Sequence, residues 1–173
     1  MFSPYGLCDG NCCISFVITV ISFDIARIAK ATGMKPEEFA ELRRLDILSF
    51  DESQVVECKN GKYTESCLLA LKSHPCCFFD NKKGCTIHIS KPLACRIYPH
   101  DEAGHFGRRA FCPFLPSLFF RLSGPSKKLL EQYCEEKRLY ADLVRKCNRK
   151  KMNKTDAFRF LTSAGPHQFN KKT

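Results

Sequence analysis

The stretch 76–95 constrains this chain most, because it concentrates thiols in a short segment without a helical period. Cys77, Cys85 and Cys95 follow one another at intervals of eight and ten residues, with turn-forming residues between them. Tight turns can bring thiolates together at about 2.3 Å from a metal ion. The spacing therefore predicts a metal site whose ligands are presented by turns.

Cysteine content and the absence of export signals favour a metal framework over disulfides. The chain has 173 residues, of which 12 are cysteine and 44% are hydrophobic, which suits one domain with a modest core. No export signal opens it, and no apolar run approaches the roughly 18 residues of a membrane span. We therefore expect a cytoplasmic protein without membrane contact. Thiols stay reduced there, except in extreme thermophiles, so they bind metals or are buried.

Charge and turn residues divide the chain in two. Residues 124–173 hold 13 Lys and Arg against 5 acidic residues, whereas residues 1–123 hold 15 against 13. The dipeptide Gly124-Pro125 stands at the boundary. We expect a cysteine-cluster metal-binding domain at 1–123, and a C-terminal basic amphipathic helix within 124–173 that packs on it and ends in a frayed tail.

The apolar pattern predicts an α+β fold: a small, loop-rich, metal-centred domain with short strands and helices, followed by the basic helix. Expected strands lie at 14–21 and 68–71, and an Asn-Gly turn at 59–62 indicates a hairpin. Expected helices are one that Ser22 can cap and Gly33 ends, one from Pro36 that buries Phe39, Leu42 and Leu45, and one at 126–150.

A second group of thiols lies near the N-terminus, where Cys8, Cys12 and Cys13 fall within six residues around turn formers. Adjacent cysteines in such a place favour metal ligation over simple burial. Because adjacent thiols rarely point the same way, they would serve one polynuclear cluster or two separate metals. One more thiol, Cys112, precedes a proline, as does the last cluster ligand of bacterial ferredoxins.

Taken together, these motifs resemble those of the YkgJ-like cysteine-cluster family. The resemblance rests on Cys8-x3-Cys12-Cys13, on Cys77-Phe-Phe-Asp, on Gly84-Cys85-x-Ile-His-x-x-Lys-Pro-x-x-Cys95-Arg-x-Tyr-Pro and on Cys112-Pro113, over 8–113. That family is described as zinc- or iron-chelating, or as iron–sulfur-containing, and has four thiols in its first motif where this chain has three. The pattern implies metal or cluster ligands at Cys8, Cys12, Cys13, Cys77, Cys85, Cys95 and Cys112.

Two kinds of metal centre compete for these thiols. Zinc favours cysteines two to four residues apart, and among the proposed ligands Cys8 and Cys12 have that spacing. Iron–sulfur clusters accept ligands scattered over a longer chain and often lie beside a Cys-Pro dipeptide. We therefore expect an iron–sulfur cluster, of the 4Fe-4S type, with zinc as the alternative.

Other residues near the pattern are given lesser roles. Arg96 follows a proposed ligand and could donate hydrogen bonds to a thiolate, a sulfide or a nearby carbonyl, or lie on the surface. His88 occupies a position where the family pattern often has tyrosine, and we do not expect it to be a ligand. Cys76 is the second choice for the place given to Cys77. The thiols expected to be structural are Cys58, Cys67, Cys134 and Cys147.

The predicted function is metal binding, with a role in electron transfer, redox sensing or metal handling beside a redox or metal-handling protein partner. One alternative is a zinc-stabilised binding module whose basic C-terminal helix contacts nucleic acid or protein. Another is an accessory protein related to the cysteine domain of flagellin lysine N-methylases. The chain has no motif for hydrolysis or phosphoryl transfer, so an enzyme role would be metal-dependent redox chemistry or methyl transfer.

Overall fold

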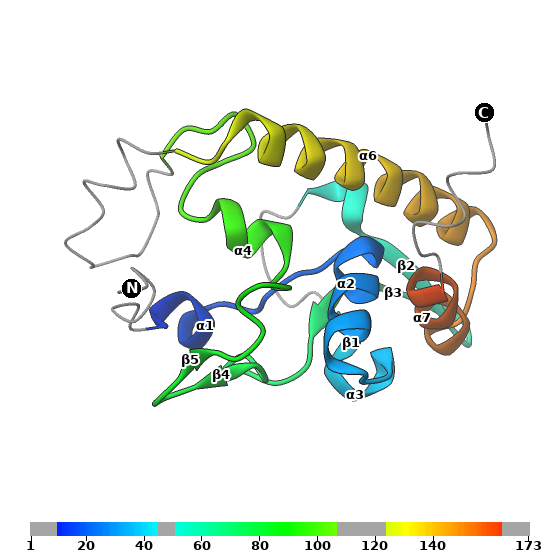
Figure 1. Ribbon diagram of the computed structural model, residues 1–173. Coiled ribbons are helices and arrows are strands. Elements are labelled where there is room, and N and C mark those ends of the chain that lie inside the picture. The colour runs from blue at the N-terminus through cyan, green and yellow to red at the C-terminus, as the bar shows by residue number, and fades with distance from the viewer. Residues whose placement is uncertain (1–9, 45–50, 107–123, 164–173) are drawn as a thin grey trace.

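A computed structural model describes residues 10–44, 51–106 and 124–163 (Figure 1). The elements in chain order are α1 (Asn11–Ser15), α2 (Ser22–Thr32), α3 (Pro36–Phe39), β1 (Ala40–Arg44), the 3₁₀ helix η2 (Glu52–Gln54), β2 (Val56–Asn60), β3 (Tyr63–Leu71), β4 (Phe79–Asp80), β5 (Gly84–Cys85), α4 (Leu93–Ile97), α6 (Lys127–Arg149) and α7 (Lys154–Ser163). Helices and short antiparallel strands joined by loops confirm the α+β class predicted from the sequence.

Three antiparallel strands form the larger sheet, in the order β1-β3-β2. In this register Leu42 of β1 lies opposite Leu69 of β3, so two core side chains meet on one face. The hairpin between β2 and β3 closes at Gly61, whose φ of 60° lies in the left-handed region. This is the predicted Asn-Gly turn, and it is confirmed, as is the strand through 68–71.

The predicted strand at 14–21 is wrong. Its first residues belong to α1, and the rest forms only an isolated bridge between Thr19 and Ala70. Two backbone hydrogen bonds flank that bridge, from Val20 N to Leu69 O and from Leu71 N to Ile18 O, both of 2.9 Å. The segment pairs no further because β1 and β2 occupy most of the two edges of β3.

The predicted helix from Pro36 is also largely wrong, since α3 ends after one turn and the chain continues as β1. Ala40 and Leu42 are buried on β1 while Glu41 and Arg43 are not, a period of two that suits a strand. Leu45 lies outside the described residues. Pairing with β3 therefore overrides the helical pattern read from the sequence.

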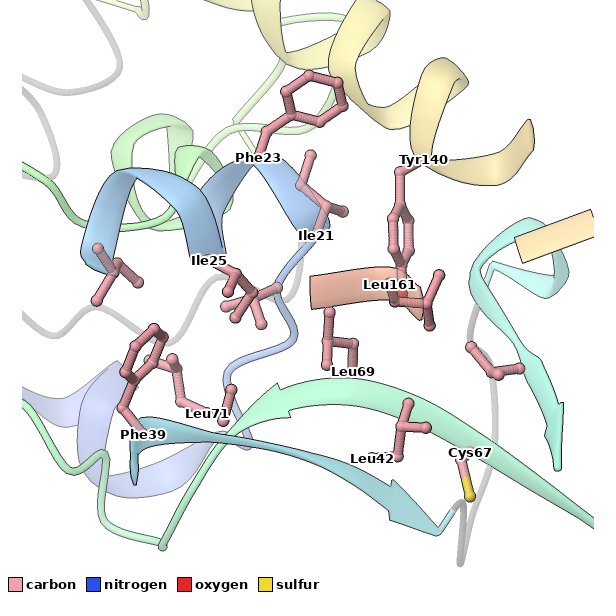
Figure 2. Packing of buried hydrophobic residues seen from close by; sticks show 14 of the residues in the cluster. Ile21, Phe23, Ile25, Phe39, Leu42, Cys67, Leu69, Leu71, Tyr140 and Leu161 are labelled. Atoms are coloured by element: carbon pink, nitrogen blue, oxygen red, sulfur yellow. The ribbon is translucent and has the colours of Figure 1, made fainter. Parts of the chain in front are cut away.

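Three helices cover the sheet and close the core (Figure 2). Ile25 of α2, Tyr140 of α6 and Leu161 of α7 are buried together with strand residues such as Leu69. The predicted end of α2 at Gly33 is confirmed by its φ of 72° and its N–H bond to Ala29 O.

The C-terminal region is more ordered than its sequence indicates. The predicted long helix is confirmed as α6, capped by Ser126, whose hydroxyl accepts from the backbone N–H of Leu129. The sequence predicts a frayed tail after this helix, but α7 (Lys154–Ser163) forms there and buries Ala157 and Leu161 completely. We call the three-stranded sheet with α2, α6 and α7 the scaffold. The short elements α1, β4, β5 and α4 lie together on one side of it (Figure 1).

Candidate metal centre

Four short segments bring five thiols into one neighbourhood. Cys12 and Cys13 lie on α1, Cys76 in the turn before β4, Cys85 on β5 and Cys95 on α4. The Cys13 thiol shares hydrogen bonds with the thiols of Cys12 and Cys76. Charge at Cys12 or Cys76 acts on both Cys85 and Cys95. Residues far apart in the sequence thus form one sulfur-rich site.

The close approach of α1 to the β4–β5 hairpin depends on Gly10. A Cβ atom at this position would lie 1.9 Å from Cε2 of Phe79, and φ is 68°. Only glycine tolerates both conditions. Next to this contact the backbone N–H of Cys76 donates to Cys13 O at 2.9 Å, so the first two thiol segments are directly tied.

The β4–β5 hairpin presents Cys85, and its turn at 80–84 is the one that the turn-forming residues between Cys77 and Cys85 predict. The Asp80 carboxylate accepts from the backbone N–H groups of Lys82 and Lys83 at 2.8 and 2.7 Å. Gly84 has a φ of 73° and completes the reversal. Cys85 then lies opposite Phe79 in the ladder, which fixes its place beside the first thiol cluster.

A buried carboxylate anchors the segment that carries Cys95. Asp24, near the start of α2, accepts from Leu93 N at 3.0 Å, at the beginning of α4, and from Ile21 N at 3.2 Å. The Arg27 guanidinium lies 2.6 Å from the same carboxylate and also binds Glu136 of α6 at 2.8 Å. Burial raises the pKa of Asp24, and Arg27 opposes that shift. This network positions α4 on the scaffold.

The thiols differ in how readily they release their protons. Hydrogen bonding from Cys13 lowers the pKa of Cys12, and hydrogen bonds from Cys13 and Cys77 lower that of Cys76. Burial raises the pKa of Cys85 and of Cys95, against the opposing positive charge of Lys91. The same hydrogen bonds raise the pKa of Cys13, so within this group the negative charge of one thiol is supported by the proton of its neighbour.

Cys76 and Cys77 differ in burial and in their contacts. Cys76 is 9% exposed and acts electrostatically on Cys85 and Cys95, whereas Cys77 is exposed and its Sγ lies 3.8 Å from Phe39 O. The Cys77 thiol also shares a hydrogen bond with that of Cys76, so it lies at the edge of the same thiol group. Cys76 is thus the more buried of the two, and the choice of Cys77 as a ligand stays a prediction.

The other predicted site residues take different places. Cys8 and Cys112 lie outside the described residues. The Arg96 side chain donates to the carbonyls of Lys91, at 3.1 Å from Nε, and Ile89, so it holds the turn before α4. The thiols expected to be structural divide into three that are completely buried in the scaffold, Cys58, Cys67 and Cys147, and the exposed Cys134.

The donor set fits a thiophilic metal centre. Thiolates are soft ligands that suit zinc, iron and iron–sulfur clusters. Within residues 10–44, 51–106 and 124–163, no three Cys, His, Asp or Glu side chains are arranged so that they could hold a metal ion. Two of the seven predicted ligands lie outside those ranges. The fit therefore rests on the gathering and chemistry of the five thiols.

A cavity of about 310 Å³ borders two of these thiols, Cys12 and Cys95. Its other lining residues are mostly apolar: Phe16, Val17, Ile18, Thr19, Ala94 and Tyr98. Apolar surroundings limit the access of water to a metal site and lower the local dielectric constant. Phe16 and Val17 are exposed, however, so the cavity is open to solvent on their side.

In the part of the chain that the structure covers, no helix combines the length and apolar character needed to cross a bilayer. The comparison with known proteins gave no match among curated proteins and none among solved structures.

The family comparison gave one match. The model named CxxCxxCC, described as "Putative zinc- or iron-chelating domain", matches residues 5–113, more than half of the chain. The matched range contains all five thiols gathered by α1, the turn before β4, β5 and α4. This chain therefore belongs to the CxxCxxCC family of metal-chelating domains.

Proposed function

We propose that the chain binds an iron–sulfur cluster through its clustered thiols and serves in electron transfer, redox sensing or metal handling. The observation that carries this proposal is the meeting of five thiols from four segments. The family match supports metal chelation by such thiols without distinguishing iron from zinc. A cluster, when bound, would supply one-electron chemistry at the thiol site.

The proposed ligands are drawn from Cys12, Cys13, Cys76, Cys85 and Cys95, together with Cys8 and Cys112 from the predicted set. A single zinc ion takes four ligands at most in a structural site, so this number of thiols favours a polynuclear centre. Cys76 replaces Cys77 in the proposal because of its burial and its electrostatic coupling to Cys85 and Cys95.

The protein's own residues would hold and shield that centre. Asp24 fixes the start of α4 through Leu93 N and thereby the position of Cys95. Phe16 and Tyr98, whose ring centroids lie 6.3 Å apart, stand beside the cavity and would limit water. Their role is to keep the thiolates in place and in a medium of low dielectric constant.

Anaerobic purification from iron-replete cells tests the proposal. Thiolate-to-iron charge transfer makes an iron–sulfur protein brown, and elemental analysis should find iron and acid-labile sulfide. Zinc has no such transition. A colourless protein that carries stoichiometric zinc would overturn the iron–sulfur proposal and leave a zinc-stabilised module.

The expected partner is a redox or metal-handling protein. Several cations of α6 are engaged within the chain: Lys137 binds Asp51 at 2.6 Å, and Arg138 binds Glu135 at 2.7 Å. Such pairing gives the nucleic-acid alternative little support. That alternative requires binding that weakens steeply with salt, because phosphate contacts release counterions.

A further inference from the structure

One end of the scaffold gathers exposed cations, where the tip of the β2–β3 hairpin meets the connection between α6 and α7 (Figure 1). Lys59 N donates to Met152 O at 2.8 Å, and Lys59 forms a parallel bridge with Asn153. These contacts hold the hairpin against the connection. We call this region the basic end, and its cations, all exposed, are Lys59, Lys62, Arg149, Lys150, Lys151 and Lys154.

Most cations of the basic end have no acidic partner. Within the described ranges one ion pair involves them, between Lys154 Nζ and Glu65 Oε1 at 3.7 Å. The carboxylate of Asp156, at the start of α7, accepts from the Asn153 side chain at 2.7 Å. The ranges outside the description contain only two of the 18 acidic residues of the chain, against five Lys and Arg. Their acidic residues are therefore too few to neutralise the basic end.

The basic end differs from the middle of α6, where Lys137 and Arg138 bind carboxylates. That pairing counts against the middle of the helix as a nucleic-acid surface. Among the described residues it continues as far as Arg145 and stops there. Arg149 and Lys150 follow about one turn later, and both are exposed. The last turn of α6 therefore presents cations that a partner can reach.

The surface between these cations is hollowed and polar. A cavity of about 440 Å³ lies there, lined by Lys59, Asn60 and Glu65 of the hairpin and by 153–156 at the start of α7. Tyr63, next to the hairpin tip, is 79% exposed. Amide and hydroxyl side chains beside cations often contact phosphate and sugar, and an exposed aromatic ring can stack on a base. The basic end thus carries both kinds of group that single strands require.

The distribution of exposed apolar side chains indicates which class of partner fits. Among the described residues, the large ones besides Tyr63 lie on α1, directly after it, or in the turn before α4: Ile14, Phe16, Val17 and Ile89. Protein interfaces have an apolar core from which lysine is depleted, and helices at a membrane surface bury an apolar face. A lysine-rich surface with one exposed aromatic ring matches neither, whereas it matches single-strand nucleic-acid binding.

We propose that the basic end binds single-stranded nucleic acid, with its lysines on the phosphates and Tyr63 stacked on a base. This inference goes beyond the proposed function and does not rest on metal binding. The basic end lies away from α1 and α4, which carry thiols of the candidate metal centre (Figure 1). A bound strand therefore leaves the thiol site accessible.

Fluorescence anisotropy of the full chain tests this proposal with labelled strands of uridine or thymidine nucleotides. A length of about 15 nucleotides lies within the range of known single-strand sites. The triple variant Lys62→Gln/Lys151→Gln/Lys154→Gln should bind more weakly. It should also reduce the slope of log K against log salt by about two, because each phosphate contact of a single strand contributes about 0.7. The titration covers about 50 to 200 mM salt.

Substitution of Tyr63 separates stacking from charge. Tyr63→Ala should weaken binding about tenfold, because stacking on an aromatic side chain contributes that much per base. The salt slope should stay at the wild-type value, since no phosphate contact is lost. Unchanged affinity in this variant would overturn the role of the ring. The side chain is exposed, so its removal should leave thermal unfolding unchanged.

The matched control is Lys82→Gln/Lys83→Gln/Lys128→Gln, which removes three exposed cations from other parts of the surface. It should bind like the wild type, and thermal unfolding checks that both triple variants fold. Equal losses in the two triple variants would overturn the proposal, because net charge alone would then explain binding. Absence of binding at about 50 mM salt would overturn it too. So would equal affinity for polyglutamate or for anionic lipid vesicles, which would indicate an acidic protein or a membrane surface instead.

Discussion

The scaffold and the thiol site of this molecule use cysteine in opposite ways. In the scaffold, Cys58, Cys67 and Cys147 are completely buried among apolar side chains of the sheet and of α6, and Cys58 and Cys67 share a hydrogen bond there, so the difference from the site is complete burial on long elements. In the site, Cys85 and Cys95 are only partly buried and lie near charges and other thiols. The residue type alone therefore does not identify a ligand; its surroundings do.

The forces that hold the two regions differ as well. The scaffold has strands of up to nine residues, a helix of 23, and a continuous apolar core. The site has helices of five residues and strands of two, joined by single backbone hydrogen bonds. Apolar burial stabilises the first region throughout, whereas the second contributes few buried apolar residues, such as Phe78 and Leu93, and is otherwise held by polar contacts and by its thiols. We therefore expect the site to depend on metal.

Removal of the metal should have the largest effect and should be confined to the site. Structural thiolate centres contribute on the order of 10 kcal/mol to folding, so amides in 76–98 should lose much of their protection from hydrogen exchange. Amides of β3 and α6 should keep theirs, because apolar burial holds them. The measurement is hydrogen exchange followed by mass spectrometry, with and without a chelator. Equal loss of amide protection in the scaffold and in the site would contradict the difference between the two regions.

Substitution of Asp24 should weaken both regions, since this carboxylate joins them. Asp24→Asn leaves Arg27 without its buried partner and weakens the bond from Leu93 N, at a cost of about 3 kcal/mol in the free energy of unfolding. Metal affinity should fall too, because α4 carries Cys95. Glu136→Gln, which changes the other partner of Arg27, is the control. It should lower the free energy of unfolding by less than Asp24→Asn and should leave metal affinity unchanged. Equal effects of the two substitutions on stability and metal affinity would argue against Asp24 as the residue that connects the two regions.

Truncation of Leu161 should destabilise the scaffold alone. Its side chain is completely buried, so Leu161→Ala should cost about 3 kcal/mol through lost transfer free energy and a cavity. Metal content should not change. Arg159→Ala, exposed on the same helix, should have little effect in denaturant titration. If Leu161→Ala unfolds at the wild-type midpoint, α7 does not contribute to the stability of the core and the frayed tail predicted from the sequence would be the better description.

Substitution of the cysteines outside the site should have the smallest effect on the free energy of unfolding. Cys147→Ala removes a buried sulfur that contacts Met152 Sδ at 3.8 Å, at a cost of about 1 kcal/mol. Cys134→Ala, on the exposed side of α6, should cost nothing measurable. Both variants should keep the wild-type metal content. A loss of metal in Cys147→Ala would mean that scaffold thiols share the role of the site.

Sequence reasoning succeeded where local chemistry decides the structure. The Asn-Gly hairpin, the Gly33 helix end, the 80–84 turn and the apolar stripe of α6 are determined within a few residues, and each was predicted correctly. It failed where distant pairing decides. Leu42 joins a strand because β3 lies beside it, and residues 18–20 meet β3 only where β2 leaves its edge free.

The candidate site was predicted in part for the same reason. Spacing by turns indicated Cys85 and Cys95, and the cluster on α1 indicated Cys12 and Cys13. The choice between Cys76 and Cys77 depends on which of them faces α1, and a backbone bond from Cys76 to Cys13 sets that direction. The role of Asp24 involves contacts between different elements, which no local spacing reveals.

The most direct measurement is the metal content per chain, determined by elemental analysis after anaerobic purification of the wild type, Cys76→Ser and Cys77→Ser. Serine nearly preserves the size of the side chain but is a poor ligand for soft metals. We expect Cys76→Ser to lose most of its metal and Cys77→Ser to retain the wild-type content. Full metal content in Cys76→Ser, or its loss in Cys77→Ser alone, would contradict the site described above.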